Sequence, residues 1–206
     1  MAITRDGVVD WMRRFAGEMG EHRQELVRLD TAIGDGDHGT NMDRGMRKAM
    51  EKVEAAEQAD PGAVLKTVAM ALVSSVGGAA GPLYGTLFLQ MGTSLAGQEE
   101  VDLAGWTEAW RKGLEGVQAR GKAEREDKTM VDALIPAIEA LEQASDLDEG
   151  LRAAVDGAEE GMRATTPLVA RKGRASYLGE RSKDHQDPGA TSTYYLFKSA
   201  AEALTG

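Results

Sequence analysis

Three carboxylates are crowded into one glycine-rich segment, LDTAIGDGDHGTNMDRG, which spans residues 29–45. Asp30, Asp35 and Asp37 lie close together in the chain, where like charges repel one another. Hard cations such as Mg²⁺ take oxygen ligands and often share them with phosphate groups. The segment therefore predicts a divalent-cation site. From these residues alone, an acidic turn lying in water stays open as the alternative.

An EF-hand is the first competing interpretation of this acidic segment. Its loop requires glycine at the sixth position and a bidentate glutamate at the twelfth. Counted from Asp35, those positions hold Thr40 and Met46. The segment is not an EF-hand.

A second segment, SSVGGAAGPLYGT at residues 74–86, is rich in glycine and leads into a helix that we expect to open at Pro82. Backbone N–H groups exposed by glycine at a helix N-terminus favour an anion such as phosphate. The Walker A pattern is absent, and no lysine lies within the segment. Close packing between two helices is the alternative explanation of these glycines.

Two later segments carry side chains that suit a nucleotide. In GRASYLGERSKDHQDPGATS, residues 173–192, Arg174 can form a bidentate pair with phosphate oxygens, and Asp187 is typical of a helix N-cap. In residues 119–134, Met130 offers a thioether that suits a flat apolar ring. A solvated charged loop and a core methionine are the alternatives. We interpret His22 as structural.

Bulk composition limits the class of protein. The chain has 206 residues with 42% apolar content, enough for the core of one domain covering residues 1–206. Its net charge of −10 argues against nucleic-acid binding, and it has no cysteine for a disulfide or a thiolate site. No apolar run suits a signal peptide or a membrane span, so we expect a cytoplasmic protein without a membrane partner.

Hydrophobic spacing predicts an all-α fold of about eight helices, without any convincing strand. One long helix is expected from residue 8 to residue 29. Asp60, Asp102 and Asp187 are expected to cap later helices, and Thr129 with Asp132 resembles a capping box. The expected helices cover residues 8–29, 42–53, 60–76, 82–91, 102–117, 129–141, 151–162 and 187–204. Residues 165–187 form the one long loop, and such loops are often functional.

Four blocks, IGDGDHGTNM, GGAAGPLYGT, DKTMVDA and GRASYLGERS followed by HQDPGA, occur in the order found in the nucleotide-binding subunit of dihydroxyacetone kinase. The chain resembles that family over essentially its whole length. The resemblance implies a barrel of eight antiparallel amphipathic helices, with the nucleotide ADP or ATP at one end and two Mg²⁺ ions bridging its phosphates.

The resemblance also implies roles for individual residues. Asp30, Asp35 and Asp37 would hold the magnesium ions, and Arg174 would act in catalysis. The implied nucleotide contacts are His38, Gly39, Thr40, Asn41, Ala79, Ala80, Gly121, Met130, Arg174, Asp187, Pro188 and Gly189. Gly121 and Met130 would lie on the adenine side of the nucleotide.

Three positions depart from the family pattern. Ala80 stands where relatives usually have serine, and Glu126 and Asp184 stand where relatives often have glycine. The two acids add negative charge near a polyanion, so we expect the nucleotide affinity to differ from that of relatives.

The resemblance further implies partners. The ketone substrate would be held on a separate K subunit, and a phosphohistidine protein of the phosphotransferase system, the M subunit, would rephosphorylate ADP in place using phosphoenolpyruvate. A homodimer is a further expectation. The runner-up is a separately encoded subunit that exchanges free ATP and serves a kinase for dihydroxyacetone or another small ketose or polyol. A relative of the fatty-acid kinases fits the first block less closely. A different class, a non-catalytic helical module with a metal-binding loop, would bind metal independently of nucleotide.

Overall fold

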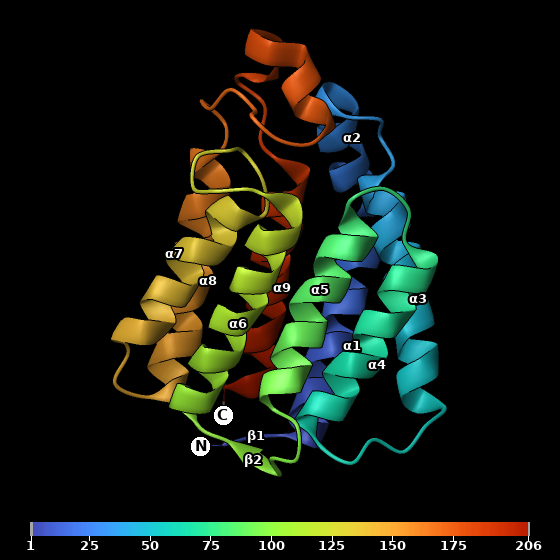
Figure 1. Ribbon diagram of the computed structural model, residues 1–206, viewed down its shortest axis with the longest axis vertical. Coiled ribbons are helices and arrows are strands. Elements are labelled where there is room, and N and C mark those ends of the chain that lie inside the picture. The colour runs from blue at the N-terminus through green and yellow to red at the C-terminus, as the bar shows by residue number, and fades with distance from the viewer. Residues whose placement is uncertain (1, 206) are drawn as a thin grey trace.

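The computed structural model describes residues 2–205, which are mostly helical (Figure 1). The two strands, β1 Ile3–Thr4 and β2 Glu100–Val101, pair antiparallel and are too short to show an alternating pattern. A 3-10 helix, η1, spans Arg174–Ser182. The α-helices of this part of the chain are α1 Arg5–Glu21, α2 Arg23–Ile33, α3 His38–Glu54, α4 Pro61–Ser75, α5 Ala80–Ser94, α6 Leu103–Gly121, α7 Val131–Gln143, α8 Leu147–Ala164 and α9 Pro188–Leu204. The all-α prediction is confirmed.

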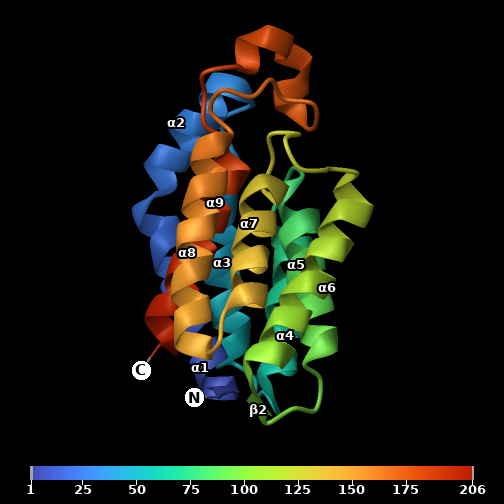
Figure 2. The ribbon, with the colours of Figure 1, turned by 90° about the vertical axis from the view of Figure 1, so that its left-hand side faces the viewer.

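The helices stand side by side and alternate in direction, which gives the molecule two distinct ends (Figures 1 and 2). Helices α3, α5, α7 and α9 begin at the end that η1 covers, which we call the cleft end. Helices α1, α4, α6 and α8 begin at the opposite end, which we call the capped end. With α2 continuing α1, this is the expected barrel of eight antiparallel positions.

Aromatic rings fill the centre of the barrel. Trp11 meets Trp106 edge-on with 5.2 Å between ring centroids, and Trp110 stacks on Phe197 at 4.2 Å. All four side chains are almost completely buried, and Phe88 packs edge-on against Trp11. Few aromatic residues are present, but they are concentrated where the helices converge, so the core gains large apolar burial from each.

Polar side chains cap each helix that starts at the capped end. Thr4, Asp60, Asp102 and Asp146 each accept a hydrogen bond from an N–H group of the first turn that follows, in α1, α4, α6 and α8 respectively. Such caps satisfy donors that the helix leaves without partners. The predicted caps at Asp60 and Asp102 are confirmed.

The predicted single helix over residues 8–29 is wrong in one detail, because the chain bends at His22 between α1 and α2. The ψ angle of His22 is 10°, although the helical bond from its N–H to the Glu18 carbonyl persists. The His22 ring stacks on Tyr195 at 4.1 Å and lies 3.0 Å from Glu25. The contact with Tyr195 of α9 and that with Glu25 of α2 favour the bend. The apolar face continues through the bend, so the spacing could not reveal it.

Other helix starts also differ from prediction. Helices α1, α3 and α8 begin three or four residues earlier than expected, at Arg5, His38 and Leu147. Helix α5 begins at Ala80 rather than at Pro82, which occupies its third position. Helix α7 begins at Val131, and only half of the expected capping box forms. The Asp132 carboxylate accepts from the Thr129 N–H at 2.8 Å, whereas the Thr129 hydroxyl accepts from Val131 N–H at 3.2 Å. The cap predicted at Asp187 is confirmed, because its carboxylate accepts from Ala190 N–H at 2.7 Å.

Residues 165–187 cross the cleft end as one long connection that contains η1 (Figure 1). Between residues 2 and 205, none of the helices combines the length and apolar character that crossing a bilayer requires.

Candidate nucleotide and metal site

The acidic turn between α2 and α3 brings the three predicted metal ligands together. One carboxylate oxygen from each of Asp30, Asp35 and Asp37 lies within 4.8 Å of the other two. The turn is tight at Gly36, whose φ of +74° lies in the left-handed region that glycine adopts without strain. A cluster of carboxylate oxygens at this spacing is a donor set that fits a hard divalent cation such as Mg²⁺.

Asp30 is the buried member of this cluster and also organises the start of α3. Its Oδ2 atom accepts hydrogen bonds from the N–H groups of Asp37 at 2.8 Å and His38 at 3.0 Å. Its side chain also lies against Gly34, where any Cβ would fall 2.1 Å from Oδ1. The segment therefore folds around Asp30, and this holds the other two acids in place.

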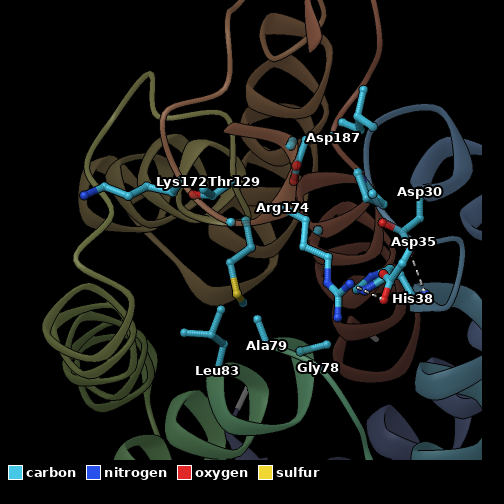
Figure 3. A pocket seen from close by; sticks show the side chains of 18 of the residues that line it. Asp30, Asp35, His38, Gly78, Ala79, Leu83, Thr129, Lys172, Arg174 and Asp187 are labelled. Atoms are coloured by element: carbon cyan, nitrogen blue, oxygen red, sulfur yellow. Dashed lines mark hydrogen bonds and ion pairs between the residues drawn. The ribbon is translucent and has the colours of Figure 1, made fainter. Parts of the chain in front are cut away.

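Arg174 reaches this cluster from η1, far away in the sequence. Its guanidinium forms an ion pair with the Asp35 carboxylate at 3.0 Å (Figure 3). Both side chains are partly open to solvent, so the pair contributes little to the free energy of folding. Its importance lies in position, because it places a cation beside the predicted metal ligands.

A cleft of about 820 Å³, including its open mouth, lies between the acidic turn and the loop that carries Arg174. The N-termini of all four helices that start at the cleft end line it, through His38 of α3, Ala80 of α5, Met130 before α7, and Pro188 of α9. The N-cap residues of α3, α5 and α7 make no side-chain cap. Helix N-termini carry partial positive charge and unpaired N–H groups, so this end is suited to a polyanion.

A second cavity of about 760 Å³ joins the first and is more apolar. Its walls include Gly121 at the end of α6, Val117 and Val131. Both cavities share Ala79, Leu83, Thr129, Met130, Lys172 and Gly173. Figure 3 shows Leu83 and Ala79 below this junction, with Lys172 pointing away from Asp35. A charged group next to the acidic turn and a flat apolar group near Met130 can therefore belong to one molecule.

The glycine-rich segment before α5 serves two purposes. A Cβ on Gly81 would lie 2.4 Å from the Val76 carbonyl, and one on Gly85 would lie 2.4 Å from the Val73 side chain, so these two glycines allow close helix packing. Gly77 and Gly78 instead line the cleft, and Gly78 has a φ of +66°. Both explanations offered by the sequence apply, to different glycines.

His38 is held by a chain of hydroxyl groups. Its Nε2 atom lies 2.9 Å from Ser192 Oγ, which lies 2.7 Å from the Tyr84 hydroxyl. Burial lowers the pKa of His38, despite nearby Asp30 and Asp37, so the ring is neutral at pH 7. Burial likewise raises the pKa of Tyr84 to about 12. This chain links the start of α3 to α5 and α9, three of the elements that line the cleft.

The remaining predicted contacts of α3 differ in position. Gly39 and Thr40 are not among the residues lining the cleft. A Cβ on Gly39 would lie 2.2 Å from the Arg23 carbonyl, so this glycine allows α3 to approach α2. Asn41 is buried near Gly77, and Arg44 donates to its Oδ1 atom at 2.7 Å. Asn41 therefore packs against the glycine-rich segment, but like Gly39 and Thr40 it is not among the residues that line the cleft.

Asp187, Pro188 and Gly189 all line the cleft, and their contact with a nucleotide stays a prediction. The Asp187 carboxylate is already occupied as the cap of α9. Burial raises the pKa of this carboxyl to about 7, with a further contribution from the charge of Asp132, against the hydrogen bonds that it accepts.

Reasoning from the sequence missed several residues of this region. Lys128 is completely buried and lies beside the cleft, and Lys172, Tyr84 and Thr129 line it as well. Lys128 stands inside the DKTM block, where the resemblance assigns a nucleotide contact to Met130. A buried lysine cannot be recognised from spacing, because lysine is the residue least expected in a core.

The two acids that replace glycine have an unusual backbone conformation. Glu126 has a φ of +69° and Asp184 a φ of +65°. This left-handed region is favourable for glycine and costly for other residues, which explains why glycine suits both positions. The expected effect of the two acids on nucleotide affinity stays a prediction.

Comparison with known proteins gives consistent results. Residues 32–202 match the family described as the DAK2 domain. The chain is 43% identical to the ADP-binding subunit of the PEP-dependent dihydroxyacetone kinase of Escherichia coli K12, over 98% of this chain and 99% of that protein. It is 34% identical to the L-erythrulose 1-kinase of Mycolicibacterium smegmatis, over 96% of this chain and 35% of that larger protein.

Among solved structures, the dihydroxyacetone kinase of C. freundii has the same fold, with a TM-score of 0.74 and 26% identity. The match covers 95% of this chain but only 34% of that one. A second structure of that kinase, in complex with AMP-PNP and Mg²⁺, gives a TM-score of 0.72 at 25% identity. These matches confirm the resemblance that the four sequence blocks indicated.

Proposed function

Because the chain belongs to the DAK2-domain family, we propose that it is the nucleotide-binding subunit of a phosphoenolpyruvate-dependent dihydroxyacetone kinase. In this proposal residues 1–206 form one cytoplasmic domain that holds ADP or ATP with two Mg²⁺ ions. The observation that carries the proposal is the cleft, where four helix N-termini meet a cluster of three carboxylates beside an apolar cavity.

Each part of the cleft has a role in this proposal. Asp30, Asp35 and Asp37 would hold Mg²⁺, which when bound neutralises phosphate charge. The backbone around Gly78, together with the start of α3, orients the phosphates, while Met130 packs against the adenine ring. Arg174 would move from Asp35 to the transferred phosphoryl group, where its charge stabilises the transition state.

Separate partners complete the reaction in this proposal. The chain corresponds to about a third of the solved C. freundii kinase but to nearly all of the Escherichia coli subunit. By similarity to the Escherichia coli ADP-binding subunit, the dihydroxyacetone-binding function would belong to a K subunit. A phosphohistidine protein, the M subunit, would return a phosphoryl group to ADP without release of the nucleotide. Homodimer formation is an additional proposal.

Calorimetric titration of Mg²⁺ with and without ADP tests the central part of this function. We expect ADP to raise the affinity for Mg²⁺ by about 5- to 150-fold, the usual range of coupling between two bound ligands. Equal affinity in both titrations would instead identify a metal-binding module without a nucleotide. Mass spectrometry of the gently purified protein supplies a second test, because an in-place cofactor should remain bound.

An ATP-dependent kinase for dihydroxyacetone or another small ketose is the second candidate. The similarity to L-erythrulose 1-kinase over 96% of this chain favours it. The two candidates differ in nucleotide exchange. ADP that stays bound while free ATP is added, and turnover that requires phosphoenolpyruvate, would support the first. Rapid ADP release and turnover on ATP with a K subunit alone would support the second.

A further inference from the structure

Lys128 is a buried cation to which the proposed function gives no role. Its side chain is 1% exposed, and its backbone has a φ of +63°. Lysine is almost never fully buried unless its ammonium group is paired. Here the pairing is with backbone: Nζ donates to the carbonyl oxygens of Thr165 at 2.6 Å and Leu168 at 3.1 Å, and to that of His185.

These acceptors lie at the two ends of the long loop. Thr165 and Leu168 belong to its first residues, and His185 lies near its last. The Asp184 N–H also donates to the Thr166 carbonyl at 2.8 Å, and the Asp187 N–H donates to Thr165 Oγ1 at 3.0 Å. The two ends of the loop are therefore joined by hydrogen bonds, and Lys128 lies where they meet, which we call the neck of the loop.

The far part of this loop enters the cleft. Lys172, Gly173, Arg174 and Ala175 line the cavity, and Arg174 forms its ion pair with Asp35. The Arg174 side chain is 63% exposed, so few packed neighbours fix its direction. Its position depends instead on the backbone from which it projects. The neck of the loop, together with the hydrogen bond from the Arg171 N–H to the Asp127 carbonyl at 3.1 Å, holds that backbone against the barrel.

An ammonium group suits this neck because it carries three donors on one atom. A neutral side chain of similar length leaves carbonyl oxygens buried without partners, and each such oxygen costs free energy. The charge is balanced by nearby Asp132 and Asp187, although burial lowers the pKa of Lys128. The residue thus joins the segment before α7 to both ends of the loop at a single point.

We propose that Lys128 is a positioning residue for Arg174, acting by joining both ends of the 165–187 loop through its ammonium group. The effect on catalysis rests on the proposed function, whereas the effect on the loop does not. The two can therefore be tested separately.

The first experiment measures the loop without any ligand. Amide hydrogen exchange is compared between the wild-type protein, Lys128→Met and the matched control Lys48→Met, which removes an exposed lysine from α3. We expect Lys128→Met to increase exchange in residues 165–187 by at least about tenfold, with the core of α4 and α6 unchanged and the control like wild type. Unchanged exchange in the loop overturns the proposal.

The second experiment is a double-mutant cycle with Arg174→Ala, using phosphoryl transfer with the partner subunits. A misplacement of about 1 Å can cost about 100-fold in rate, so we expect Lys128→Met to lower kcat by 10- to 100-fold, as Arg174→Ala does. Because Lys128 acts through Arg174, the double variant should be no slower than Arg174→Ala within about twofold. A double variant whose kcat is lowered by the product of the two single-variant effects overturns the proposal.

Lys128→Arg addresses the case in which Lys128→Met does not fold. Arginine keeps the cation and its N–H donors, so we expect partial protection of the loop and a kcat between those of wild type and Arg174→Ala. If Lys128→Arg folds, its loop exchanges fully and its kcat equals that of wild type, then the order of the loop does not determine the position of Arg174, and the inference is refuted. If wild-type protein binds no ADP, the proposed function fails, while the exchange experiment still decides the role of Lys128.

Discussion

The helix N-termini are capped differently at the two ends of the barrel. At the capped end, a side chain of the N-cap residue bonds the first turn of each of the four helices. At the cleft end, α3, α5 and α7 have no such cap, and only Asp187 of α9 provides one. At the capped end the N-cap residue itself supplies the acceptor. At the cleft end Asp30 accepts the His38 N–H of α3 and Thr129 accepts the Val131 N–H of α7, while the start of α5 has no side-chain acceptor. The comparison indicates that the cleft end, rather than the capped end, is suited to a ligand.

Asp35→Asn should produce the largest effect and confirm that acids of the cleft end serve function. We expect phosphoryl transfer to fall by at least about 100-fold, since a preorganised electrostatic partner is lost. The melting temperature without ligand should hardly change, because the exposed pair with Arg174 contributes little and repulsion among the acids is relieved.

Asp146→Asn is the matched control for this variant, as it removes an acid from the capped end while leaving a good N-cap. It should retain full activity. A large loss of thermal stability in Asp35→Asn without ligand would contradict the account.

Asp187 is the exception at the cleft end. The pH dependence of the free energy of unfolding should show how much stability its buried carboxylate costs when ionised. Burial raises its pKa to about 7 in the folded state, above the ordinary value of 3.8. A raised folded-state pKa means that this contribution to stability is complete below about pH 4 and is lost as the pH rises to about 7. The free energy of unfolding should fall by up to about 1.4 kcal/mol per pH unit in that window.

Asp187→Asn should remove this dependence, because the amide still accepts the hydrogen bond from Ala190 without titrating. Urea unfolding of both proteins between pH 4 and 8 measures the difference. Parallel curves for wild type and variant would show that Asp187 does not titrate in this way.

Asp60→Ala should have a smaller effect, confined to stability. Asp60 accepts from Ala63 N–H at 2.7 Å and also from Gly97 N–H at 2.9 Å. Loss of an N-cap costs about 1 kcal/mol, and up to about 2 kcal/mol in strong cases. Chemical denaturation should show this loss, while calorimetry should give an unchanged affinity for ADP. Weaker nucleotide binding would mean that the two ends are coupled.

Glu126→Gly should give the smallest effect, and in the opposite direction. Glycine adopts the left-handed backbone conformation of residue 126 without strain, but it loses more conformational entropy on folding than glutamate does. The net effect should stabilise the protein by about 0.5–1 kcal/mol. Glu124→Gly is the control, an exposed neighbour without a positive φ, and it should destabilise the protein. Thermal unfolding of both variants measures the difference, and equal shifts would exclude backbone strain at Glu126.

Much of the fold could be predicted because the signals are local. Apolar residues at helical spacing marked the helices, and Asp60, Asp102 and Asp187 marked three of their starts. The bend at His22 escaped prediction because its cause, contact with Tyr195, lies in a distant helix. The start of α5 at Ala80 escaped because proline is also accepted two positions further into the first turn.

The site was predictable as a set of residue types but not as a geometry. Asp30, Asp35 and Asp37 lie close together in the sequence, so their clustering could be predicted from one short segment. The pairing of Arg174 with Asp35, the buried position of Lys128 and the hydroxyl chain behind His38 each join residues from distant segments. Side-chain spacing along one segment contains no information on such contacts.

Asp30 differs from its two neighbours because its carboxylate also accepts the N–H groups of Asp37 and His38. A mutational scan that scores only catalysis would rank the three acids as equivalent. A scan that scores protein abundance in the cell would single out Asp30, because replacing it removes the two hydrogen bonds that hold the turn, whether or not a nucleotide is bound. Variants at this position will therefore combine two defects, and cleaner tests of ion binding belong at Asp35 and Asp37.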